Sequence, residues 1–86
     1  MKINELIKII EKKILSQDCI SNVKIEDKSF LHKNHKSNEK GKFHILLLIE
    51  SAELKKKSKL NSTRFIYKIL ENELKNNIHS LQIKLI

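Results

Sequence analysis

The order of two kinds of apolar repeat most constrains the fold of this chain. Near the N-terminus, apolar side chains recur at helical spacing, which is typical of a helix with one buried face. In the middle and at the C-terminal end, apolar and polar residues alternate, which is typical of strands that bury one face. A chain that contains both repeats in 86 residues favours a layer of helices on a sheet.

These repeats predict two long helices. The first covers residues 4–16, with Asn4 as its N-cap. The second covers about 60–75 and stops at Asn76-Asn77, because asparagine tolerates the left-handed backbone conformation at a helix end. Their buried stripes are Ile3, Leu6, Ile7, Ile10 and Ile14 in the first helix, and Ile66, Ile69, Leu70 and Leu74 in the second.

Three strands are predicted: residues 21–27, a central strand around Ile45, Leu47 and Ile49, and residues 79–85. A polar stretch without periodicity at 28–41 predicts a long loop, and the basic region 51–59 predicts a turn with a short helix around Leu54. We therefore expect one α+β domain over residues 1–86, of order αββ(α)αβ, with the helices packed on one face of a three-stranded sheet.

Composition narrows the functional class. A single cysteine, Cys19, excludes a disulfide framework and a Cys/His finger, and we expect a small, half-buried side chain there rather than a reactive thiol.

The apolar run from Ile45 to Ile49 is too short to span a bilayer, and no signal-peptide pattern is present. We expect a soluble protein of a reducing cytoplasm. No Gly-x-Ser-x-Gly turn or phosphate-cradling glycine loop supports catalysis, so no enzyme is predicted.

The net charge of +8 raises nucleic acid as a partner. However, Arg64 is the only arginine. The guanidinium group, whose paired N–H donors bind guanine or phosphate with two hydrogen bonds, is therefore nearly absent. The alternative interpretation is a solvated basic surface. If nucleic acid binds, the candidate contacts are Lys55, Lys56, Lys57, Lys59, Arg64 and Lys68.

Histidines are the best functional indication. His79 lies at the predicted junction between the second helix and the last strand, so two rigid elements would hold it at the edge of the sheet. His32 and His35 lie in the predicted loop, and His44 begins the central strand. The alternatives are that the ring of His79 caps the preceding helix carbonyls and that the two loop histidines are merely solvated.

Several short motifs in a fixed order resemble those of a known family. They are Asp27-x-Ser29-x-x-His32-x-x-His35, His44-Ile45-x-Leu47-x-Ile49-x-Ser51, Lys57-Ser58-Lys59-Leu60, Arg64-x-Ile66-Tyr67 and Ile78-His79-Ser80-Leu81. The chain resembles the BolA-like family over nearly its whole length, which implies a fold related to the type II KH domain.

Two positions depart from the family pattern. Lys56 stands where the family usually has a glycine before the Lys-Ser pair, and Thr63 stands where it usually has a histidine before the arginine. Loss of the glycine removes the point at which a KH-like backbone would approach a phosphate closely. This departure puts nucleic-acid binding through that turn in doubt.

The resemblance implies a monothiol glutaredoxin as partner and a 2Fe-2S cluster shared with glutaredoxin cysteine and glutathione. In that case His79 is the first candidate ligand, His32 the second and His35 its competitor, whereas His44 is expected to orient the neighbouring loop. The free chain would be a monomer and would form a heterodimer with its partner, in cluster assembly, transfer or iron sensing. The alternatives are a DNA-binding regulator of transcription and stress morphology, and a basic interaction domain without metal.

Overall fold

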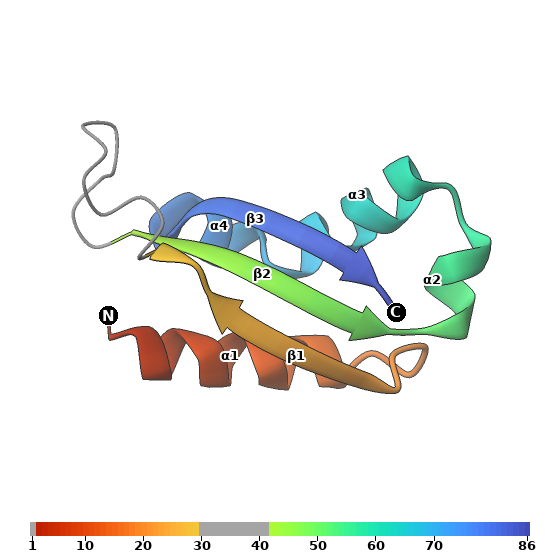
Figure 1. The fold of residues 1–86 in the computed structure, drawn as a ribbon, viewed down its shortest axis with the longest axis horizontal. Helices are drawn as coiled ribbons and strands as arrows, with labels where there is room; N and C mark the ends of the chain where they lie inside the picture. Colours follow the sequence, from red (N-terminus) through yellow and green to blue (C-terminus); the bar gives the residue numbers. More distant parts are fainter. Residues whose placement is uncertain (1, 30–41) are drawn as a thin grey trace.

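The order of elements agrees with the sequence prediction. The computed structural model describes residues 2–29 and 42–86 (Figure 1). The elements are α1 (Ile3–Leu15), β1 (Asn22–Asp27), β2 (Phe43–Glu50), α2 (Ala52–Lys56), α3 (Lys59–Ile69), α4 (Glu71–Asn76) and β3 (Ile78–Leu85). The predicted loop, with His32 and His35, falls almost wholly on residues 30–41 and therefore lies outside the described residues.

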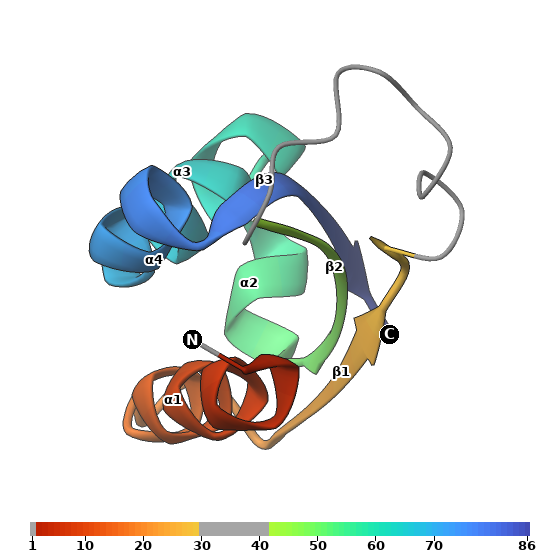
Figure 2. The same ribbon diagram turned by 90° about the vertical axis from the view of Figure 1, so that its left-hand side faces the viewer.

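The sheet is mixed, with strand order β1-β2-β3. β1 runs antiparallel to β2, whereas β3 runs parallel to β2, because the crossover through α2, α3 and α4 returns the chain to the same end of the sheet. Figure 2 shows the helices together on one side of the curved sheet, which confirms the predicted α+β layer. None of the helices in the described ranges is long and apolar enough to cross a lipid bilayer.

One core joins the helices to the covered face of the sheet. The predicted strand residues Ile45, Leu47 and Ile49 are buried at its centre. Burial of side chains of this size from water is the main favourable term in folding, at about 2 kcal/mol each. The other buried apolar residues are Leu6, Ile10, Ile14, Ile20, Val23, Leu54, Ile66, Leu70, Ile78 and Leu81.

The second long helix is kinked, which corrects the prediction of one helix over 60–75. Leu70 has φ −101° and ψ 20°, outside the helical region, and separates α3 from α4. Hydrogen bonds from Leu70 N–H to the Ile66 carbonyl and from Leu74 N–H to the Leu70 carbonyl continue across the kink. Because the apolar stripe also continues and no proline or glycine marks the kink, periodicity alone could not reveal it.

Two predicted helix ends also need correction. The first helix begins at Ile3, so its N-cap is Lys2, without a side-chain hydrogen bond, and Asn4 already lies inside the helix. The last helix ends at Asn76 as expected, but Asn77 has φ −129°, which is not left-handed. The Asn77 N–H instead bonds to the Glu73 carbonyl at 2.7 Å.

Ser51 joins three segments where β2 ends. Its side-chain oxygen accepts a hydrogen bond from Leu54 N–H at 3.1 Å and so caps α2. The same hydroxyl donates to the Cys19 carbonyl at 2.6 Å, in the connection between α1 and β1. Ser51 is 1% exposed and Leu54 is fully buried, so water cannot replace the bond that caps α2.

Ser51→Ala is therefore expected to lower the free energy of unfolding by about 2 kcal/mol, because it leaves the buried N–H of Leu54 and the half-buried carbonyl of Cys19 without their partner. The matched control is Ser58→Ala, since Ser58 caps α3 through Asn61 N–H at 3.1 Å on the exposed surface. That variant should lose only about 1 kcal/mol. Urea unfolding measures both, and equal losses would show that burial of the Ser51 bonds adds nothing.

An ion pair ties α1 to α4. Lys13 Nζ lies 2.8 Å from both carboxylate oxygens of Glu73. Glu73 is only 4% exposed, whereas the Lys13 side chain is partly exposed. A buried carboxylate without its partner is costly, so this pair fixes how α4 sits against α1.

Lys13→Ala should reduce the free energy of unfolding by about 1 to 2 kcal/mol, because it leaves the buried Glu73 carboxylate uncompensated. Lys12→Ala, on an exposed position of the same helix, serves as the control and should change little. Adding Glu73→Leu to Lys13→Ala should recover stability. A double-mutant cycle with no coupling between residues 13 and 73 would contradict this role.

Candidate functional site

His79 lies where α4 passes into β3. α4 ends at Asn76 and β3 begins at Ile78, so the predicted place of this histidine at a helix-strand junction is confirmed. The junction is anchored on both sides, because Ile78 is buried in the core and Phe43 N–H donates to the Asn77 carbonyl at 2.9 Å. The His79 side chain itself is exposed. A rigid backbone thus presents an accessible imidazole.

His44 supports the ring of His79 from the neighbouring strand. Its ring centroid lies 4.9 Å from that of His79, with 59° between the ring planes. The Nδ1 atom of His44 is 2.7 Å from the Ser80 hydroxyl, and His44 is 5% exposed. Which of the two groups donates depends on the histidine tautomer. The buried ring of His44 is therefore held in place beside the exposed ring of His79.

The alternative role of His79 as a helix cap finds no support. Across residues 2–29 and 42–86, no hydrogen bond joins the His79 ring to a carbonyl of α4, and its ring contact is with His44. The last helix instead closes through the backbone of Asn77. The imidazole nitrogens of His79 are thus not used to end the helix.

The backbone of His44 holds the segment that follows β1. Its carbonyl accepts from Lys28 N–H at 2.7 Å, and its N–H donates to the Ser29 hydroxyl oxygen at 3.1 Å. Ser29 N–H in turn donates to the Asp27 side chain at 2.9 Å. These bonds hold Lys28 and Ser29 against β2. The expectation that His44 orients the rest of the loop concerns residues outside the described ranges and stays a prediction.

The contact between His44 and His79 was not foreseen from the sequence. It arises because β2 and β3 are parallel and their register shifts between Phe43 and His44. Phe43 lies opposite Ile78 and His44 lies opposite Ser80, so His79 is the extra residue between the two pairs. The two histidines are 35 positions apart along the chain, and no local pattern indicates which residues of two strands will be neighbours. The sequence offered one indication of this site: Ser80, whose hydroxyl bonds to the His44 ring, follows His79 directly in the last motif.

The described residues do not form a complete metal site. No group of three His, Cys, Asp or Glu side chains that could hold a metal ion occurs in them. Cys19 is half-buried, as predicted, and its carbonyl bonds to Ser51 near the end of β2, whereas His79 lies beside the start of β2. His79 is therefore not part of a three-ligand metal site within the described residues.

The basic candidates divide into separate groups. Lys55, Lys57 and Lys59 line a groove that also includes Lys84 of β3. Arg64 and Lys68 are exposed on α3 but do not line that groove, and Lys56 is the last residue of α2. The six side chains therefore do not form one cluster.

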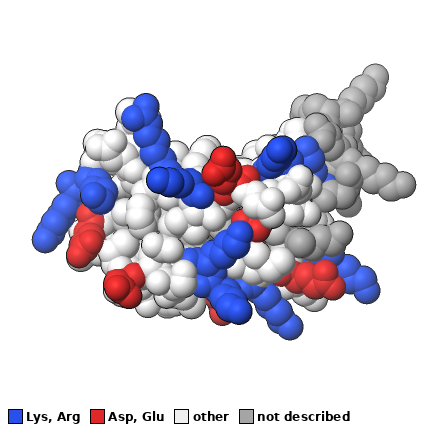
Figure 3. All heavy atoms as spheres, turned by 180° about the vertical axis from the view of Figure 1, so that it is seen from behind, with Lys and Arg blue, Asp and Glu red and all other residues white. Residues whose placement is uncertain are grey.

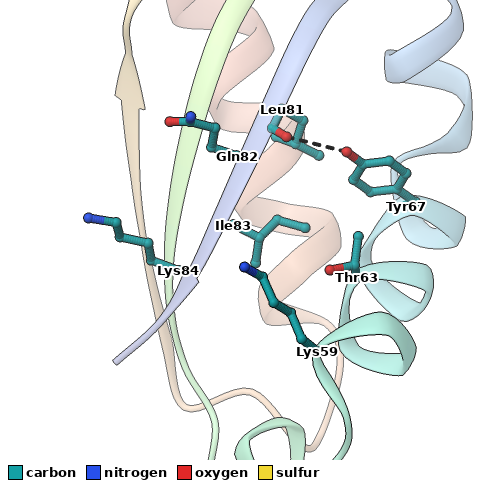
Figure 4. Close-up of a pocket in the computed structure, with 7 residues that line it drawn as sticks. All are labelled: Lys59, Thr63, Tyr67, Leu81, Gln82, Ile83 and Lys84. Carbon is teal, nitrogen blue, oxygen red and sulfur yellow. Dashed lines mark hydrogen bonds between the residues drawn. The ribbon is translucent and has the colours of Figure 1, made fainter.

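The two departures from the motif pattern both lie near this groove. Lys57 and Ser58 form the turn between α2 and α3, and both have negative φ, so this turn does not require glycine. Thr63 lines the part of the groove between α3 and β3 (Figure 4). Tyr67, on the same face of α3, donates its hydroxyl to the Leu81 carbonyl at 3.3 Å.

Comparisons with known proteins agree with this architecture. The chain is 34% identical over 77 residues to the "DNA-binding transcriptional regulator BolA" of Haemophilus influenzae, covering 90% of this chain and 72% of that protein. The BolA domain of SufE1 from Arabidopsis thaliana superposes with a TM-score of 0.74 at 26% identity, covering 99% of this chain and 92% of that one. A bol-like protein from Babesia bovis has the same fold, with a TM-score of 0.68 at 19% identity, covering 92% of this chain and 80% of that chain.

The family model for BolA-like proteins matches residues 15–86, which include every element after α1. With the curated relative from Haemophilus influenzae and the shared fold, this match establishes the family. The chain is a member of the BolA-like protein family.

Proposed function

We propose that this protein is a non-enzymatic partner of a monothiol glutaredoxin and supplies His79 as a ligand to a shared 2Fe-2S cluster. One observation carries the proposal: the exposed ring of His79 stands at a fixed junction, beside the buried ring of His44. A ligand that must meet a cluster on another protein has to be accessible and held in place. His79 meets both conditions.

The chemistry of the chain fits a shared cluster better than a self-contained one. Iron-sulfur clusters are held mainly by thiolates. The only cysteine, Cys19, lies near the end of β2, whereas His79 lies beside the start of β2. Imidazole can replace thiolate in some 2Fe-2S centres, and it makes the cluster less negative. Thiolates of glutaredoxin and glutathione would complete the ligand set. Such a complex would serve cluster assembly, cluster transfer or iron sensing.

The roles of the neighbouring residues follow from their contacts. The bond between His44 and Ser80 orients the His44 ring, and that ring limits the positions open to His79. His44 would therefore act as a positioning residue rather than as a ligand. His32 and His35 remain candidates for a second ligand, and both follow directly on the segment that the His44 backbone holds.

A first prediction concerns His79. We mix the protein anaerobically with a monothiol glutaredoxin, glutathione, iron and sulfide, and record visible absorption and circular dichroism. The wild type should change the cluster spectrum relative to glutaredoxin alone, and His79→Ala should abolish that change because the nitrogen ligand is lost. His32→Ala and His35→Ala, made separately, identify the loop ligand.

The control for this experiment is Ser80→Ala. It removes the bond to His44 but leaves the His79 imidazole in place, so it should weaken the altered spectrum without abolishing it. If wild type and His79→Ala give the same spectrum as glutaredoxin alone, and gel filtration shows no complex, the proposal is wrong.

A second candidate function is DNA binding. Its support is the group of lysines along one groove, Lys55, Lys57, Lys59 and Lys84, together with the description of the Haemophilus influenzae relative as a DNA-binding regulator. Against it, Figure 3 shows basic side chains interleaved with acidic and neutral ones over the helical face of the molecule. Lysines bind phosphate as point charges, without the paired N–H donors of arginine, so this function ranks second.

A second prediction tests DNA binding by its salt dependence. If the lysines contact phosphates, Lys57→Ala and Lys59→Ala should each lower the slope of log K against log salt by ~0.9. Lys12→Ala on the exposed side of α1 is the control and should leave the slope unchanged. Fluorescence anisotropy with a labelled duplex gives the slopes. Equal slopes for all four proteins would exclude the groove as the DNA site.

A further inference from the structure

β3 forms one edge of the sheet, and part of its backbone faces outward. The Ile86 N–H donates to the Ile49 carbonyl at 2.9 Å, which places the backbone of residue 86 toward β2. Backbone groups of successive strand residues point to alternate sides, so the N–H and C=O groups of Ile83 and Leu85 point away from β2. The bond from the Tyr67 hydroxyl to the Leu81 carbonyl, on that outer side, agrees with this alternation (Figure 4).

These outward groups are available for pairing. An edge strand presents a row of unpaired donors and acceptors that can template another strand. Tyr67 occupies the Leu81 carbonyl, whereas no backbone or side-chain hydrogen bond to the outer side of Ile83 or Leu85 occurs within the described part of the chain. The open part of the edge therefore begins just after Leu81.

A groove runs along this part of the edge. One portion, of about 390 Å³, lies between Lys59, Thr63 and Tyr67 of α3 and residues 81–84 of β3 (Figure 4). A second portion, of about 450 Å³, extends past Leu85 and Ile86 toward α2. The two portions share four lining residues, so they form one continuous channel beside the strand.

The groove carries positive charge and some apolar surface. No aspartate or glutamate is among the lining residues of either portion, whereas Lys55, Lys57, Lys59 and Lys84 are. Ile83 and Leu85 are only half-buried and contribute apolar contact area. An occupant should therefore bring negative charge, a strand-forming backbone and some apolar side chains.

We propose that the outer edge of β3 binds an extended acidic segment of a partner protein, which adds to the sheet as a fourth strand. Its backbone pairs with the N–H and C=O groups of Ile83 and Leu85, and its carboxylates face the groove lysines. Main-chain hydrogen bonds supply affinity in this mode of recognition, and side chains supply specificity. This goes beyond cluster ligation, since it assigns a second binding surface to β3.

Other occupants fit less well. A second copy of this chain would bring its own lysines to the groove. Because each chain carries a net charge of +8, the two copies would repel each other. Nucleic acid would match the lysines, but a phosphate has only acceptor oxygens and cannot satisfy the outward carbonyls of Ile83 and Leu85. A peptide offers both donors and acceptors at strand spacing.

This surface is separate from His79. Ile83 is four positions after His79 in β3, a rise of roughly 13 Å at strand geometry. The isolated chain can bind a peptide whether or not it ligates a cluster. A failed cluster experiment therefore does not bear on this proposal, and His79→Ala should bind the peptide like the wild type.

The test uses a fluorescein-labelled heptapeptide of alternating glutamate and valine. A second version carries N-methyl groups on two consecutive central residues, so both of its strand edges lose a donor while its charge is unchanged. We expect anisotropy titrations to show binding of the first peptide and at least tenfold weaker binding of the second. Amide exchange by NMR should slow at Ile83 and Leu85, and not at the outer amides of β1.

Two lysines provide a matched pair of variants. Lys24 of β1 and Lys84 of β3 both lie opposite Leu48, so they occupy the same row of the sheet at opposite edges, and both are exposed. Lys84→Glu should weaken peptide binding about tenfold, whereas Lys24→Glu should change it less than about twofold.

Three outcomes would overturn the proposal. Equal binding of the N-methylated peptide would show that backbone pairing is not involved. Equal losses in the two lysine variants would show that only net charge matters. If a single-stranded oligonucleotide bound in a Lys84-dependent way and the peptide did not, the groove would belong to nucleic acid.

Discussion

The pairing of β2 with strands on both sides is the constraint on which the rest of this structure depends. Its covered face, with Ile45, Leu47 and Ile49, lies at the centre of the core, so α1 and α3 can bury their stripes only where this strand lies. Its parallel pairing with β3 requires the chain to cross over through α2, α3 and α4. That crossover brings His79 to the start of β2, beside His44.

Specific polar contacts fix the relative positions of the helices and strands, which apolar packing alone does not determine. Ser51 joins the end of β2 to α2 and to the segment before β1, and the pair of Lys13 and Glu73 joins α1 to α4. Apolar contacts are nondirectional, whereas these bonds have defined geometry and are costly to leave unmade when buried. Ser51, which belongs to one of the family motifs, therefore stabilises the scaffold.

β3 presents two different surfaces from one strand. Its first residues display an imidazole beside a buried, hydrogen-bonded ring, and its outer edge displays unpaired backbone next to a basic groove. Because β3 is both anchored by Ile78 and left open on one side, it can hold a ligand at one end and an extended chain along its edge. A central strand could not offer the second surface.

The sequence by itself determined the layered α+β class, the positions of the strands and the junction at His79, because apolar periodicity records which face of each element is buried. It could not show the kink at Leu70, since the stripe of Ile66 and Leu74 continues through it. Only the tertiary structure decided that His44 meets His79, that Lys13 pairs with Glu73, and that Lys55, Lys57 and Lys59 line one groove with Lys84. These contacts join residues distant in sequence, and strand register and helix packing, which no local pattern encodes, set them.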